Sequence, residues 1–200
     1  MTPEPDPGRH PRPVSSPEAP DEASEPGPGA VRVPERLSSR DAEALFSRLP
    51  PVSTDALTGF WRGRVVDTGH PYDAMLRASR WIGKEFLAPE RVHPLVHEGA
   101  FGRLRLDPGR IPLRLARALG LAHWPGARAV ARIAGPLFAT SRPRARLRTV
   151  LDGDEPTAAM IYDQRPIIDV FRRVDAATVM GRMDEKGAHR PAFFLLTREA

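Results

Sequence analysis

The side chain best suited to chemistry is Asp169, a carboxylate inside an apolar, strand-like run. Side chains of a strand alternate between its two faces. If Ile168 and Val170 face the interior, Asp169 is a surface carboxylate. If Ile167 and Phe171 face the interior, Asp169 points into a cavity. Burial there would raise the pKa of its carboxyl group or require a partner.

Four other residues carry side chains that could pair with this carboxylate, namely Arg64, His70, Lys84 and Tyr162. Such a set could bind the polar head group of a ligand. It could also transfer protons, with Tyr162, Asp169 and His70 as the candidate catalytic acids and bases. A buried polar network that only fixes the register of the strands would use the same residue types. All three interpretations remain open at this stage.

Metal and cofactor chemistry is not indicated. His93 and His97 are four residues apart, which is a spacing of metal ligands, but Pro94 between them disrupts a helix and no third ligand is evident. The chain has no cysteine, so disulfides and thiolate sites are excluded. Phosphate-binding loops, the G-x-S-x-G elbow and the H-E-x-x-H motif are absent. We therefore expect no metal and no cofactor.

Charge is distributed unevenly along the chain, which has a formal net charge of +5. No acidic residue lies between Asp107 and Asp152, whereas this window contains nine arginines. Proteins that bind nucleic acid usually combine such charge with aromatic side chains. Here only Trp124 and Phe138 are interleaved, so we expect no nucleic-acid partner.

Residues 108–142 differ from the rest of the chain in pattern. The spacing of Val130, Ile133 and Leu137 is typical of the apolar face of a short basic helix. We predict two such helices, which would form a lid or rim. In the strand that follows, Arg144, Arg146 and Arg148 alternate with apolar residues. They form either a solvated face or a positive collar for an anionic ligand.

The remaining pattern predicts a mainly β fold. A helix is expected from Ser38 to Leu49 and a short one over 72–79. Strands are expected over 57–66, 80–86, 91–97, 101–107, 144–151, 157–163, 167–174, 177–184 and 192–198. Closely spaced strands with tight turns are typical of an antiparallel meander that curls into a barrel.

Residues 1–36 are expected to form a disordered tail. Ten of the 23 prolines lie within residues 1–34, among Ser, Glu and Gly. No stretch approaches the roughly 20 apolar residues of a membrane-spanning helix, and the N-terminus has no apolar core of a secretory signal. We expect a cytoplasmic protein with no transmembrane segment.

Several segments together resemble a bacterial family named for its GXWXG motif, in which that domain precedes a C-terminal domain of unknown function of the DUF4334 type. The matching segments are LTGFWRGR (57–64), TGHP (68–71), RWIGKEF (80–86), VHPL (92–95), RARLRTV (144–150), AAMIYDQRPIIDVFRRVD (158–175) and MDEKG with FFLL (183–196). The resemblance spans about residues 45–198 and is weakest over 108–142. It implies a small lipocalin-like barrel and no established activity.

The motif itself suggests how one end of such a barrel is closed. Gly59, Trp61 and Gly63 share one face of a strand, so the flanking glycines leave space for the large indole. Calycin-like barrels place an arginine of the last strand over this ring, and Arg198 is the matching residue here. A tryptophan that only packs in the core is the simpler alternative.

These observations predict a lipocalin-like antiparallel β-barrel with an N-terminal helix and a helical, Arg-rich insertion. Its parts are the tail (1–36), the GXWXG region (37–107), the basic insertion (108–142) and the C-terminal meander (143–200). The sequence does not indicate an oligomeric state.

The favoured function is the binding of a small, mostly apolar or anionic ligand with an acidic or polar head group. The expected ligand-binding residues are Trp61, Arg64, His70, Trp81, Lys84, Tyr162, Asp169 and Phe171. One alternative is a cofactor-free isomerase or cyclase that uses Tyr162, Asp169 and His70. Another is a haem-binding barrel like nitrobindin, although His189 lies in an expected turn rather than on an inward face.

Overall fold

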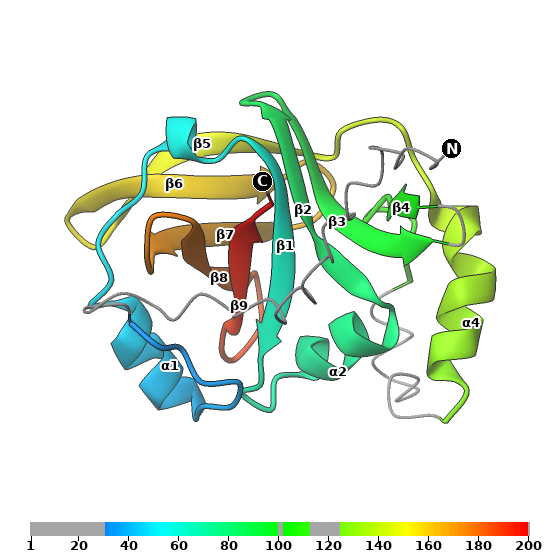
Figure 1. Ribbon diagram of the computed structural model, residues 1–200, viewed down its shortest axis with the longest axis horizontal. Coiled ribbons are helices and arrows are strands. Elements are labelled where there is room, and N and C mark those ends of the chain that lie inside the picture. Colours follow the sequence, from blue (N-terminus) through cyan, green and yellow to red (C-terminus); the bar gives the residue numbers. More distant parts are fainter. Residues whose placement is uncertain (1–30, 100–101, 113–124, 200) are drawn as a thin grey trace, which may run out of the picture.

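One antiparallel sheet of nine strands dominates the structure, a computed structural model that describes residues 31–99, 102–112 and 125–199 (Figure 1). The strand order is β2-β1-β9-β8-β7-β6-β5-β3-β4, and β2 also pairs with β3. Eight strands therefore form a closed ring of pairings, with β4 attached to β3. The mainly β, antiparallel fold expected from the sequence is confirmed.

The N-terminal half supplies four strands and three helical segments. They are α1 (Ser39–Phe46), the 3₁₀ helix η1 (Thr54–Ala56), β1 (Gly59–Val66), α2 (Pro71–Ala78), β2 (Trp81–Ala88), β3 (Arg91–Gly99) and β4 (Gly102–Arg105). The Ser38 hydroxyl caps α1 by accepting a hydrogen bond from the backbone N–H of Asp41 at 3.1 Å. This is the N-terminal helix expected at Ser38.

The C-terminal half follows the expected meander within two residues at every strand boundary. It comprises α4 (Ala127–Ala134), the 3₁₀ helix η3 (Gly135–Phe138), β5 (Ala145–Asp152), β6 (Glu155–Tyr162), β7 (Ile167–Arg173), β8 (Thr178–Glu185) and β9 (Ala192–Arg198). Tight turns join β5 to β9 in sequence order, so each strand pairs with its neighbour in the chain.

Apolar side chains pack on both sides of the sheet. One cluster fills the inside of the ring and includes Trp61, Phe86 and Phe171. The second lies between the outer face and α1, where Phe46 packs against Phe193 with ring centroids 6.1 Å apart. Because both faces are covered at β7 to β9, these strands are apolar on both sides rather than alternating.

Ordered structure begins before residue 36, where we expected the tail to end. The first 30 residues of the expected tail lie outside the described residues. Val33 is buried in the second cluster. Two backbone hydrogen bonds, Asp67 to Glu35 (2.8 Å) and Leu37 to Asp67 (3.0 Å), tie the segment to the end of β1. The amino-acid composition of residues 1–36 does not reveal that a few residues at the end of this segment contact β1.

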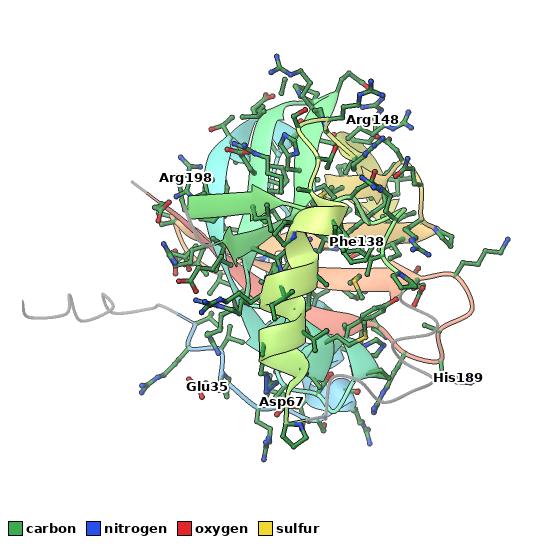
Figure 2. The ribbon with its side chains drawn as sticks, turned by 90° about the vertical axis from the view of Figure 1, so that its right-hand side faces the viewer. Glu35, Asp67, Phe138, Arg148, His189 and Arg198 are labelled. Atoms are coloured by element: carbon green, nitrogen blue, oxygen red, sulfur yellow. The ribbon has the colours of Figure 1, made fainter. Side chains whose placement is uncertain are left out.

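The basic insertion differs from expectation in its orientation. Of the two helices expected in 108–142, the structure describes α4 with η3, and residues 113–124 lie outside the described part. Val130, Ile133 and Leu137, the residues of its expected apolar face, are 47%, 78% and 70% exposed. Ala127, Ala131 and Ala134 are half-buried, whereas Ala129 is exposed, and the helix lies beside α2 (Figures 1 and 2).

Candidate functional site

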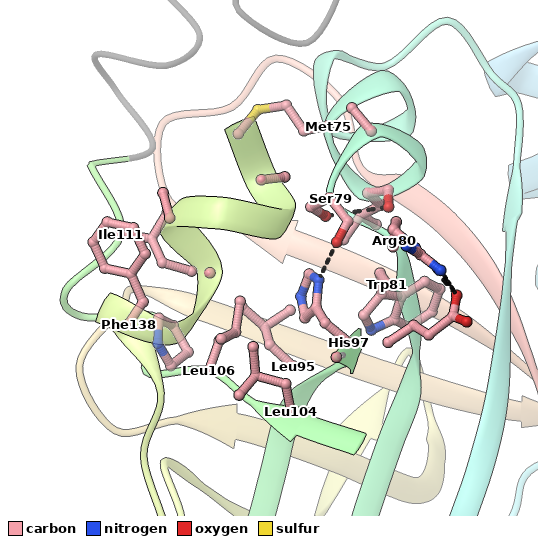
Figure 3. A pocket seen from close by; sticks show the side chains of 18 of the residues that line it. Met75, Ser79, Arg80, Trp81, Leu95, His97, Leu104, Leu106, Ile111 and Phe138 are labelled. Atoms are coloured by element: carbon pink, nitrogen blue, oxygen red, sulfur yellow. Dashed lines mark hydrogen bonds and ion pairs between the residues drawn. The ribbon is translucent and has the colours of Figure 1, made fainter. Parts of the chain in front are cut away.

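A cavity of about 760 Å³ lies between α2, strands β2 to β4, and the α4–η3 segment (Figure 3). Its walls are predominantly apolar, and they include Met75, Leu76, Leu95, Leu104, Leu106 and Phe138. The volume falls in the range of small-molecule sites, which combine apolar walls with a few placed polar groups. This cavity is the candidate functional site.

Lys84 of β2 lies at the inner end of the cavity with Tyr162 of β6. Its Nζ atom forms an ion pair with Asp169 Oδ2 at 2.8 Å. The same ammonium donates hydrogen bonds to the Pro94 carbonyl at 3.2 Å and to the Tyr162 hydroxyl at 3.3 Å. An ammonium has three donors, so all of those of Lys84 have acceptors within the protein.

Burial controls the electrostatics of this cluster. It lowers the pKa of the Lys84 amine, an effect that the nearby Asp169 carboxylate opposes. Burial also raises the pKa of the Asp169 carboxyl group, against the influence of Lys84 and Tyr162, and it raises the pKa of the Tyr162 phenol well above its usual range. The Phe194 ring centroid lies 4.8 Å from Nζ, so an aromatic face supports the ammonium.

His97 of β3 presents an unpartnered nitrogen in the wall of the cavity. Its Nδ1 lies 2.7 Å from the carbonyl oxygen of Ser79, which can only accept, so Nδ1 carries the proton (Figure 3). Nε2 is buried and has no hydrogen-bond partner among the described residues. Burial lowers the pKa of His97 to about 4. Nε2 is therefore a free acceptor at neutral pH.

Trp81 of β2 provides the complementary group. It is directly opposite His97 in the pairing of β2 with β3, and both residues line the cavity. The indole Nε1 is a donor only, and it is buried without an acceptor in the part of the chain that the structure describes. A free donor and a free acceptor thus occupy neighbouring positions in a mostly apolar site.

Family models match two parts of the chain. Residues 44–102 match the model described as GXWXG protein, and residues 143–198 match the domain of unknown function DUF4334. A crystal structure of a protein from Thermomonospora curvata is 32% identical, with a TM-score of 0.62, and the match covers 83% of this chain and 91% of that one. The chain belongs to the GXWXG family with a DUF4334 domain. No curated protein matches it.

The tryptophan and the second glycine of the GXWXG motif contact different parts of the protein: Trp61 packs in the core, and Gly63 leaves space for the indole of Trp81. Trp61 is buried inside the ring of strands, its Nε1 donates to the Thr58 carbonyl at 3.0 Å, and the Arg198 guanidinium lies 5.0 Å from its ring centroid. The space beside Gly63, which we assigned to Trp61, is filled by the ring of Trp81. Gly59 has a φ of +78°, a backbone conformation that favours glycine, and no neighbouring atom restricts it.

Five of the expected ligand-binding residues of this GXWXG protein do not line the cavity. The His70 Nδ1 accepts a hydrogen bond from the Tyr72 backbone and caps α2. Arg64 donates to the Val33 carbonyl on the outer side of β1. Phe171 and Asp169 face the inside of the ring, but Phe171 is core and Asp169 lies behind Lys84. Trp61, also expected at the site, packs in the same core.

The guanidinium groups of Arg144, which precedes β5, and of Arg146 and Arg148 on β5 are paired. Arg144 lies 2.6 Å from the buried Asp107, Arg146 lies 2.8 Å from Asp163, and Arg148 lies 2.6 Å from Glu90. Because each charge has a counterion, the three arginines do not form a free positive collar. The Arg146 and Arg148 side chains are 44% and 41% exposed, whereas that of Arg144 is only 22% exposed. Within the described residues, no three His, Asp or Glu side chains form a group that could hold a metal ion. No described helix has the length and apolarity to cross a membrane.

Sequence reasoning missed the role of His97, whose spacing to His93 was considered only as a possible metal site. It did predict a lid or rim in residues 108–142, and α4 of this segment lines the cavity. The position of His97 opposite Trp81 depends on the β2–β3 register, which shifts at several points along the pair. Such bulges leave no regular trace in the sequence.

Proposed function

We propose that this protein binds a small, mostly apolar molecule with a polar head group, within a lipocalin-like barrel. The observation that carries the proposal is the cavity of about 760 Å³, whose walls are apolar and whose buried Trp81 and His97 nitrogens have no partner among the described residues. Unpaired buried polar atoms cost about 1–3 kcal/mol each. A ligand that pairs with them recovers this free energy.

The positions of the candidate acids and bases favour binding over catalysis. Of Tyr162, Asp169 and His70, only Tyr162 lines the cavity within the described structure. Asp169 is paired with Lys84, and His70 caps a helix. Proton transfer requires a group within hydrogen-bond reach of the substrate. The geometry therefore supports the isomerase or cyclase interpretation less well than it supports ligand binding.

A matched pair of substitutions on α4 tests the proposal. Ala131 lines the cavity, whereas Ile133, two residues further on, is 78% exposed. We expect Ala131→Trp to fill part of the cavity and to weaken binding of the neutral fluorophore N-phenyl-1-naphthylamine by about tenfold or more. Ile133→Trp should leave its Kd unchanged. Equal Kd values for both variants and the wild type, or no binding at all, contradict the proposal.

Haem binding is the second candidate, and the geometry of His97 favours it. Imidazoles that bind metals usually donate their other N–H to a carbonyl or carboxylate, as His97 does to Ser79. Titration with haemin while the visible spectrum is recorded tests this function. A Soret shift that saturates in the wild type and is lost in His97→Ala would support haem binding. An unchanged spectrum leaves the apolar ligand as the occupant.

A further inference from the structure

We propose that the head group of the ligand is an uncharged hydroxyl, held between Nε2 of His97 and Nε1 of Trp81. This inference rests on the proposed function and specifies its ligand. A hydroxyl donates one hydrogen bond and accepts others, so a single O–H group satisfies both ring nitrogens. A hydrocarbon satisfies neither of them, and an ether oxygen can only accept, from Trp81.

The positions of the two side chains support their joint action. They are cross-strand partners in the pairing of β2 with β3, and Cβ atoms of such partners lie about 5 Å apart. Trp81 is 8% exposed and His97 is 4% exposed. In Figure 3 the imidazole and the indole lie beside each other in the cavity wall. Both nitrogens are buried and have no partner within residues 31–99, 102–112 and 125–199, so a ligand in the cavity can supply one.

The same surroundings disfavour a carboxylate at this position. Nε2 of His97 is a lone-pair acceptor because the ring proton is held on Nδ1 by the Ser79 carbonyl. An anion next to this lone pair would be repelled. Lys84 offers no compensating donor, since its ammonium is already bound by Asp169, Pro94 and Tyr162.

The arginines at the cavity rim do not change this conclusion. Arg80 is paired with Glu98, and Arg103 is paired with Glu199. Arg132 on α4 also lines the cavity but is exposed, where water screens its charge. A cation at the rim attracts anions to the opening without providing a buried partner for them.

Three probes with the same chain test the proposal: decan-1-ol, decyl methyl ether and decanoate. Each is measured at pH 7.5 by its displacement of N-phenyl-1-naphthylamine from the full-length protein. We expect decan-1-ol to bind about tenfold more tightly than the ether, and the decanoate to bind most weakly. Equal affinities for alcohol and ether, or tighter binding of decanoate, overturn the inference. If the fluorophore itself does not bind, the proposed function fails as well.

Two further measurements assign the effect to the named atoms. In His97→Phe, the preference for alcohol over ether should disappear, while affinity for the ether stays within about threefold of that of the wild type. In the unmodified protein, the ¹⁵N resonance of His97 Nε2 should shift when decan-1-ol is added and remain unchanged with the ether. A preference that survives in His97→Phe, or a silent resonance, overturns the assignment.

Discussion

Gly63 on β1 and Trp81 on β2 share one space, because a Cβ atom on Gly63 would overlap the six-membered ring of Trp81. Such a Cβ atom would lie only 2.6 Å from Cζ3 and 2.7 Å from Cζ2 of that ring. The second glycine of the GXWXG motif is therefore linked to an aromatic residue 18 positions later. Since Trp81 also lines the cavity, the motif and the site depend on each other.

The first prediction concerns this overlap. We expect Gly63→Ala to displace Trp81 and to lower the free energy of unfolding by about 1–3 kcal/mol, as overpacking of a core does. Fluorophore binding should weaken in the same variant. Gly153→Ala is the control. No atom lies near Gly153 in the β5–β6 turn, so an added methyl group would strain only the backbone, which has a φ of +65° there. Urea unfolding measures the stability of the two variants, and fluorophore titration measures their Kd. A normal Kd in Gly63→Ala would refute the link to the site.

The second prediction concerns the buried pair of Lys84 and Asp169. Lys84→Met leaves the Asp169 carboxylate without its counterion and should destabilise the protein by about 3–5 kcal/mol. The double variant Lys84→Met/Asp169→Leu should be more stable than Lys84→Met, because no uncompensated charge remains. Denaturant titration of the single and double variants measures this. If the double variant is the less stable of the two, the pair does not behave as a buried ion pair.

The third prediction separates a structural role of Asp169 from a role at the ligand. Asp169→Asn keeps the shape of the side chain but removes its charge, so it should lower the unfolding free energy. Because Asp169 does not line the cavity, the Kd of N-phenyl-1-naphthylamine should stay within about twofold of the wild-type value. A variant of normal stability with weakened binding would instead identify Asp169 as a head-group partner.

The fourth prediction is a pH dependence. In the folded protein the pKa of His97 is lowered from 6.5 to about 4, so the unfolded chain binds its proton first as pH falls. Stability from this residue is complete above pH 6.5 and is lost between pH 6.5 and 4, by about 3 kcal/mol in total at 1.36 kcal/mol per pKa unit. His97→Gln should reduce the slope of unfolding free energy against pH in this interval. An unchanged slope would contradict the burial of a neutral imidazole.

The fifth prediction tests where ordered structure begins. Val33 is 7% exposed, whereas Val31 is 40% exposed only two residues earlier. Val33→Ala should therefore cost about 1–2 kcal/mol through lost apolar burial, and Val31→Ala should cost much less. Thermal unfolding of the full-length variants compares them. Similar midpoints for both would place residues 31–36 in the tail, as their composition suggested.

The sequence predicted the strands well because tight turns and apolar runs are local signals. It left the orientation of Asp169 open for a physical reason. Ile167 and Phe171 pack inside the ring, while Val170 packs under α1, so β7 is apolar on both faces. Alternation then carries no information on which side is the interior. Only the packing of α1 against the outer face decides it.

The sequence also could not predict that Trp81 and His97 lie opposite each other in the cavity wall. This arrangement depends on a hairpin whose register shifts, and on a cavity that has α4 as one wall. The apolar stripe of α4 does not show by itself which residues face the cavity. Val130 and Ala131 line it, whereas Ile133 is 78% exposed.

The path of the chain between the two family matches has a consequence for how this protein can vary. β3 and β5 are neighbours in the ring, joined through the pairing of Val92 with Ala145 and a hydrogen bond from the Arg144 backbone N–H to the Val92 carbonyl. The chain leaves the ring at Gly99, the end of β3, and re-enters it beside Val92, near the start of the same strand. The register of β3 is set by its pairing with β2, and that of β5 by its pairing with β6. Because α4 forms part of the cavity wall but takes part in none of these strand pairings, we expect substitutions on α4 to change the shape of the cavity without shifting the register of the ring.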